Sequence, residues 1–235
     1  MTVRPVLSLA GALVLCASAF TLPGASAAPV HPSVRVARPS GGFHQYSIAQ
    51  EWSAWGRYLG VSSRRRDSSP SHAHACSGVG TGSDYFQTQW LVLPGKYALE
   101  LGTDHRCNLS FWYWGFFDAR GAWRQLGSRV IEPFSEHTFS IARSAADPRR
   151  WEFVVDGAVL GAVRLPRPML GMTVALGVES YAADTSGVEL FTDLRYRSEG
   201  SRQWLAWKGR DWSGTGEAMV GTWLSDRDWL AGQRN

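Results

Sequence analysis

Short runs of aromatic and β-branched residues, separated by turn residues, recur along most of the chain. Such runs predict strands, and no helical periodicity competes with them. Asp156-Gly157 is a strong signal for a two-residue hairpin turn. Many short strands at regular spacing predict an all-β, antiparallel two-sheet β-sandwich or, less simply, a closed barrel, and we favour the sandwich. The expected strands are 84–93, 96–103, 110–118, 124–131, 136–142, 150–156, 159–165, 172–181 and 187–197.

Two of these strands share an unusual alternation of side chains. Large aliphatic residues occupy one face, which period-two geometry assigns to the core. The other face carries one glutamate among small residues, which leaves room for a ligand to approach the acid. These residues are Ala98, Glu100 and Gly102 on the first strand, and Ala175, Gly177 and Glu179 on the second.

Aromatic residues could line the sides of a groove over this face. The run from Phe111 to Phe117 supplies aromatic side chains on either face of its strand. A glutamate on a sheet face turned to water is also ordinary, so each acid alone has a purely structural interpretation. The repeated arrangement makes Glu100 and Glu179 a candidate acid/base pair. The predicted substrate-lining residues are Trp90, Trp112, Trp114 and Tyr181.

Residues 1–27 have the three parts of a secretory signal peptide. An early Arg4, an apolar run and small residues at Ala25 and Ala27 fit cleavage after position 27 and export from the cell. We expect 28–42 to be a flexible leader, 43–197 the β-sandwich, and 198–235 a Trp-rich segment packed on it. Cys76 and Cys107 would then be the cysteines of the mature chain, and a lone pair in an exported protein predicts one disulfide.

Composition excludes several function classes. The chain has 235 residues, 44% of them hydrophobic, and its 12 Trp fit an aromatic-rich β protein. The net charge of +4 gives no reason to expect nucleic acid, and no segment after the signal is apolar enough to span a membrane. The arginine-containing stretch 62–72 is interpreted as a solvated loop. His72, His74 and His105 with the cysteines lack standard zinc spacing, so we predict no metal and no other cofactor.

The segment from Glu100 to Cys107, followed by the aromatic strand Phe111–Trp114, resembles the first active-site segment of the glutamic peptidases, or eqolisins. In that family a catalytic Gln lies two residues before the Gly, and a catalytic Glu follows about eighty residues later. Here Glu179 lies 179 − 100 = 79 residues on. The chain departs from the family at Glu100, which stands in the place of Gln, although the related neprosin-type peptidases use two glutamates.

The resemblance covers about residues 84–197 and implies a concanavalin A-like double-sheet jelly roll with acid endopeptidase activity. One carboxyl would activate water and the other, protonated, would polarise the scissile carbonyl and protonate the leaving amine. The same pair could instead serve a glycoside hydrolase, and aromatic platforms could serve a non-catalytic glycan-binding module. We therefore expect a monomer that acts on a polypeptide or a polysaccharide, with enzyme activity left open between these alternatives.

Overall fold

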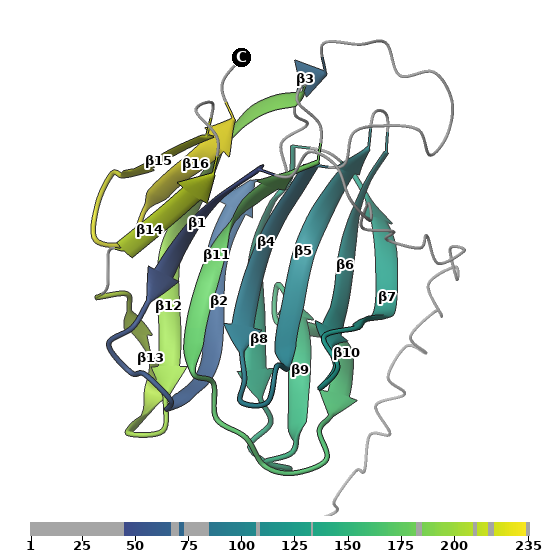
Figure 1. Cartoon of the computed structure of the whole chain (residues 1–235), viewed down its shortest axis with the longest axis vertical. Coiled ribbons are helices and arrows are strands. Elements are labelled where there is room, and N and C mark those ends of the chain that lie inside the picture. The colour runs from purple at the N-terminus through teal and green to yellow at the C-terminus, as the bar shows by residue number, and fades with distance from the viewer. Residues whose placement is uncertain are drawn as a thin grey trace, which may run out of the picture. The chain divides into compact units, whose positions relative to one another are not determined.

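The computed structural model describes residues 45–66, 71–72, 85–106, 109–132, 134–181, 185–208, 211–215 and 219–233. All of them lie within one structural unit, His31–Asn235. Throughout these ranges the regular elements are β-strands, which form two sheets (Figure 1). Among the described residues, no helix has the length and apolar character needed to cross a membrane.

The first sheet has seven strands, and every pairing within it is antiparallel. The central strands β11, β4 and β5 carry the two candidate glutamates, and β1 and β6 flank them. In spatial order the strands are β14 (Asp211–Thr215), β1 (Gln45–Glu51), β11 (Thr173–Ser180), β4 (Tyr85–Val92), β5 (Ala98–Arg106), β6 (Leu109–Phe117) and β7 (Trp123–Ile131).

The second sheet has nine strands and is also antiparallel. Its main path is β10 (Ala158–Arg164), β9 (Arg150–Val155), β8 (Glu136–Arg143), β2 (Tyr58–Arg66), β12 (Thr185–Ser198), β16 (Trp229–Gln233) and β15 (Met219–Trp223). The long strand β12 also pairs with β13 (Ser201–Ala206) and β3 (Ser71–His72).

The hydrophobic core lies between the sheets, because each contributes one apolar face. Leu99 and Leu101 of β5 point into it, as their alternation predicts. Each large apolar side chain buried there contributes about 1.5–3 kcal/mol relative to exposure. The largest fully buried members are Tyr58, Tyr85, Leu91, Phe139, Trp151, Phe153, Phe191 and Trp229.

The predicted antiparallel two-sheet sandwich is confirmed. Every predicted strand is present, with ends shifted by a few residues. The hairpin at Asp156-Gly157 also forms between β9 and β10, and both residues have positive φ, 50° and 79°. Positive φ at both central positions is what a type I′ turn requires, and Asp-Gly suits it.

Two expectations about the remaining chain are wrong. The stretch 62–72 is not a loop from its start, because β2 continues to Arg66. Arg65 is 1% exposed, and its guanidinium lies 3.7 Å from the centre of the Phe139 ring. The segment after 198 does not pack on a finished sandwich: β14 extends the first sheet, while β13, β15 and β16 belong to the second.

The expected signal peptide at 1–27, the leader at 28–42 and the proposed disulfide between Cys76 and Cys107 lie outside the described residues. His74 lies outside them as well. The signal peptide, the leader and the disulfide remain predictions from the sequence.

Candidate functional site

Strand β4 lies between β5 and β11 and aligns their side chains into rows. Residues directly opposite each other in an antiparallel pair point to the same face of the sheet. The face in question is turned away from the core, because the alternate residues Leu99 and Leu101 are core residues. We call it the acid face, defined by the rows Glu100–Trp90–Ala175, Gly102–Thr88–Gly177 and Asp104–Phe86–Glu179.

Glu100 is fully buried on this face and is bound by two hydroxyl groups. Tyr113 Oη donates a hydrogen bond to Glu100 Oε1 at 2.6 Å, and Thr88 Oγ1 donates to the same oxygen at 3.2 Å. Gly102 makes this arrangement possible, since a Cβ there would lie 2.7 Å from the Tyr113 ring. The small residue beside the acid therefore admits a neighbouring side chain that satisfies a buried carboxylate.

Glu179 has a comparable but less enclosed environment. It is 6% exposed, and Tyr181 Oη donates a hydrogen bond to its Oε2 at 3.3 Å. The ring of Phe86 makes edge contacts with both tyrosines, with centroids 5.7 Å from Tyr113 and 5.7 Å from Tyr181. Phe86 therefore packs between the two tyrosine–carboxylate pairs.

The register sets how far apart the two glutamates stand. Glu100 is level with Trp90 on β4, whereas Glu179 is level with Phe86, four residues along that strand. At ~3.4 Å per residue and ~4.8 Å per strand, the two Cα atoms are about 17 Å apart. Carboxyl pairs that act across one water lie roughly 6.5–9.5 Å apart, measured between the carboxyl groups and not between Cα atoms. Glu100 and Glu179 thus share a face without facing each other, and the residue level with Glu100 on β11 is Ala175.

Of the predicted substrate-lining aromatics, Trp90 and Tyr181 lie on the acid face. Trp90 is opposite Glu100 and 8% exposed, and Tyr181 binds Glu179. Both are thus close neighbours of the two candidate acids.

The prediction that Trp112 and Trp114 line this face is wrong. Trp114 pairs with Leu101, so both tryptophans point into the core between the sheets. There the Trp114 ring lies against Gly161 of β10 in the other sheet, and Trp112 makes an edge contact with Phe139.

Sequence reasoning missed several side chains of the acid face. Asp104 is fully buried and lies level with Glu179 across Phe86. Tyr113 and Thr88, which bind Glu100, were also not singled out. Tyr113 comes to this face because it lies opposite Gly102 in the pairing of β6 with β5, which alternation along a single strand does not give.

Nothing in the described part of the chain forms a group of three or more His, Cys, Asp or Glu residues suited to a metal ion. His105, considered earlier for such a role, is 1% exposed on the core side of β5, and its Nδ1 lies 2.8 Å from Ser110 Oγ. The pairing of imidazole with hydroxyl satisfies a buried polar group and is a structural arrangement.

The chain matches no protein-family model and no curated protein. It is similar to solved structures of scytalido-glutamic peptidase. The complex with a transition state analog inhibitor matches with a TM-score of 0.58 and 13% identity, and a complex with a peptide-based transition state analog with 0.54 and 12%. Each match covers 81% of this chain and 98% of the peptidase.

The chain has the fold of a glutamic peptidase. The expected jelly-roll sandwich and the resemblance inferred from the Glu100 segment are therefore confirmed at the level of fold. More distant matches include a Bacillus licheniformis β-glucanase, with a TM-score of 0.37 and 10% identity, at a similarity too low to inform function. Fold alone does not assign an activity, so function has to be argued from the acid face itself.

Proposed function

We propose that the chain is an exported hydrolase of polypeptides with its reaction centre at Glu100 and with Glu179 as the second carboxyl group. The observation that carries the proposal is the buried Glu100 carboxylate, bound by Tyr113 and Thr88 on the outer face of a sandwich with the glutamic-peptidase fold. Export rests on the signal-like residues 1–27.

In this proposal an ionised carboxylate takes a proton from water as the water attacks the scissile carbonyl. The second carboxyl, protonated, hydrogen-bonds the carbonyl oxygen and then gives its proton to the leaving amine. Because one group must hold a proton while the other does not, we expect cleavage to be fastest at acidic pH.

The register imposes a condition on this mechanism. The Phe86 and Tyr113 rings pack beside Glu100 and Glu179, and Glu100 has no exposed surface. A substrate reaches Glu100 only when side chains on the acid face move. Because β11 is fixed by its pairing with β1 and β4, Glu179 can act on the same substrate only through rotation of its side chain. We infer that the arrangement seen here is a resting one, which substrate binding rearranges.

A second candidate is a polypeptide-binding protein that does not cleave. The observation that favours it is Ala175, which occupies the position level with Glu100 where a second carboxylate would face it most directly. The glycan-binding alternative loses its main support, since Trp112 and Trp114 pack inside the core.

Incubation of the purified chain with casein between pH 2 and 6 tests the proposal. We expect fragments to appear, and Glu100→Gln to abolish them while Glu179→Gln slows their release. The matched control is Glu132→Gln, because Glu132 is an exposed glutamate outside both sheets. Association with casein but no fragments at any pH would support the second candidate and reject hydrolysis.

A laminarin or cellulose substrate in the same series separates peptide from glycan chemistry. Release of reducing sugar that depends on Glu100 would replace the polypeptide assignment with a glycosidase. No release, together with casein cleavage, is the result that we expect.

A further inference from the structure

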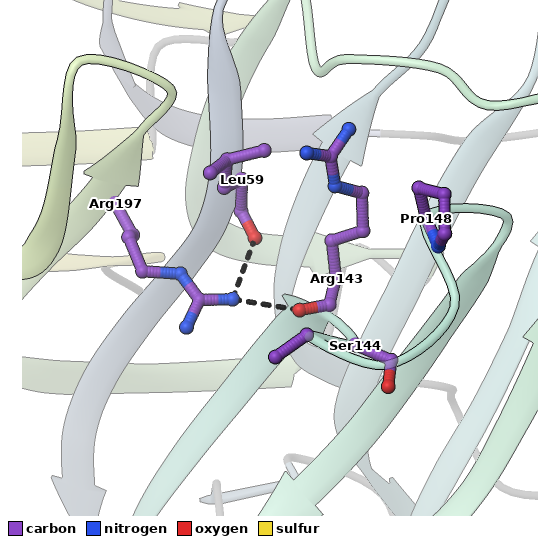
Figure 2. A pocket seen from close by; sticks show the side chains of 6 residues that line it. Leu59, Arg143, Ser144, Pro148 and Arg197 are labelled. Atoms are coloured by element: carbon purple, nitrogen blue, oxygen red, sulfur yellow. Dashed lines mark hydrogen bonds between the residues drawn. The ribbon is translucent and has the colours of Figure 1, made fainter.

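A pocket of about 270 Å³ lies on the nine-stranded sheet (Figure 2). Glu100 and Glu179 belong to strands of the other sheet. Its residues come from β2, from the end of β8 with the loop that follows, and from β12. They are Leu59, Arg143, Ser144, Ala145, Pro148 and Arg197.

Arg197 is held in this pocket by backbone carbonyl groups. Its Nη2 donates hydrogen bonds to the oxygen of Arg143 at 2.7 Å and to the oxygen of Leu59 at 3.5 Å (Figure 2). The guanidinium also lies 5.5 Å from the centre of the Trp204 ring. These contacts fix the direction of the side chain, and its Nε is buried with no hydrogen-bond partner among the described residues.

Positive charge in the pocket is poorly balanced. Within the described ranges neither Arg143 nor Arg197 forms an ion pair. Burial, and next the nearby charge of Arg143, lower the pKa of Arg197, and the opposing influence of Glu152 does not cancel them. Glu152 is already bound, since Arg150 Nε donates to its Oε1 at 2.9 Å. Two guanidinium groups thus line a partly buried cavity without a carboxylate of their own.

We propose that this pocket binds a phosphate or sulfate group, with Arg197 and Arg143 as the cations and the Ser144 hydroxyl as a further donor. Guanidinium groups bind tetrahedral oxyanions through charge-assisted hydrogen bonds, and they keep their charge at every physiological pH. The buried Nε of Arg197 would gain an acceptor, and the repulsion between the two arginines would be relieved. The group would be either a free ion or an ester on a larger molecule.

Thermal unfolding of the full chain tests the proposal. The midpoint is measured with increasing sodium phosphate or sodium sulfate, and sodium chloride holds the ionic strength constant. A ligand that binds only the folded state raises the midpoint in a saturable way. We expect such a rise, and Arg143→Gln should weaken the apparent affinity by about tenfold, as expected for the loss of one charge-assisted contact.

Arg167→Gln is the matched control, because Arg167 is exposed and lies outside the pocket. The proposal would be overturned if the midpoint did not rise above its value in sodium chloride. It would also be overturned if Arg143→Gln and Arg167→Gln lost the same amount of apparent affinity for the ion. Arg143 is the substituted residue because Arg197 also binds two backbone oxygens, so its removal would confound binding with folding.

Dextran sulfate compared with dextran distinguishes an ester from a free ion. If the polymer binds more tightly per sulfate group than inorganic sulfate does, the ligand is an ester on a larger molecule; if it does not, a free ion is the ligand. Glu100→Gln should leave the rise of the midpoint with phosphate or sulfate unchanged, so this proposal stands or fails separately from hydrolysis at Glu100.

Discussion

At the scale of single residues, the acid face depends on the match between a small residue and a hydroxyl group. Gly102 leaves the space into which the Tyr113 ring fits, and the Tyr113 hydroxyl then satisfies Glu100. The sequence could predict the glutamate and its small neighbours from alternation alone. The sequence could not show which aromatic residues of the run 111–117 lie on the acid face, because both faces of that strand carry aromatic rings. Only the pairing with β5 places Tyr113 there and turns Trp112 and Trp114 toward the core.

Replacing Tyr113 with Phe removes the shorter hydrogen bond to a fully buried carboxylate. We expect the free energy of unfolding to fall by about 1–3 kcal/mol, the usual cost of leaving a buried polar group short of a partner. Tyr181→Phe is the comparison, and its effect should be smaller because Glu179 keeps some exposure and its bond is longer. Urea unfolding of both variants gives the two values, and the reverse order would contradict this account of Glu100.

Asp156 provides a pH-dependent contribution to stability. Burial would raise the pKa of Asp156, but hydrogen bonds from the Thr138 backbone and from His137 outweigh it, and the pKa lies below its ordinary value. Stability from a carboxylate with a lowered pKa is present above the unfolded value, near 3.9, and is lost as the pH falls through the folded value.

We therefore expect Asp156→Asn to destabilise the chain at pH 6 by less than about 1 kcal/mol, because the group is half-exposed. The difference from the original protein should shrink below pH 4. Asn tolerates the positive φ of this turn position, so the substitution tests the charge and not the backbone. Guanidinium-induced unfolding at both pH values measures it, and a difference that grows on acidification would be the contrary result.

At the scale of elements, the strands between 84 and 197 could be predicted from the sequence, because each has period-two alternation and is bounded by clear turn residues. The strands at either end were not. The end of β2 is a run of arginines, so its sequence shows no alternation of apolar and polar residues. Arg65 is nevertheless buried, because its guanidinium packs on the ring of Phe139. In β14 to β16, tryptophans stand among Gly, Ser and charges, and their places depend on pairing with β1 and β12, which are distant in the chain.

Strand β16 should be essential to the core although it lies near the end of the chain. Trp229 is fully buried and packs against Phe191 of β12, with ring centroids 5.8 Å apart. We expect Trp229→Ala to cost about 3–5 kcal/mol, the usual range for deleting a buried aromatic side chain. Trp212→Ala on edge strand β14 is the matched control, because Trp212 is 47% exposed. Equal unfolding midpoints for the two variants would show that the C-terminal strands do not complete the core.

At the scale of the whole molecule, two segments far apart in sequence bring acids to one sheet face. Alternation within each strand predicted that Glu100 and Glu179 lie on the face away from the core, but not the four-residue offset between their rows. That offset follows from the pairing of β4 with both neighbours, which a single sequence does not encode in any local pattern. In the proposed hydrolysis, the rate should therefore be limited by the distance of the second carboxyl group from Glu100.

Ala175→Glu tests that limit directly. It places a carboxylate level with Glu100, two strands away or about 10 Å between Cα atoms. We expect a casein cleavage rate about tenfold or more above that of the unaltered chain, since orienting a catalytic group is worth at least that much. Ala175→Gln is the control for size without charge. A folded Ala175→Glu variant that cleaves no faster than the glutamine control would contradict the proposed limit.

The rate of casein cleavage at pH 2–6 by the unaltered chain and by Glu100→Gln decides whether Glu100 is the reaction centre of a hydrolase. We expect cleavage at acidic pH that is lost in Glu100→Gln, while Glu132→Gln keeps it and all three proteins unfold at similar temperatures. No cleavage by the folded, unaltered chain, or equal cleavage by Glu100→Gln, would contradict the assignment of Glu100 as the centre of a hydrolase.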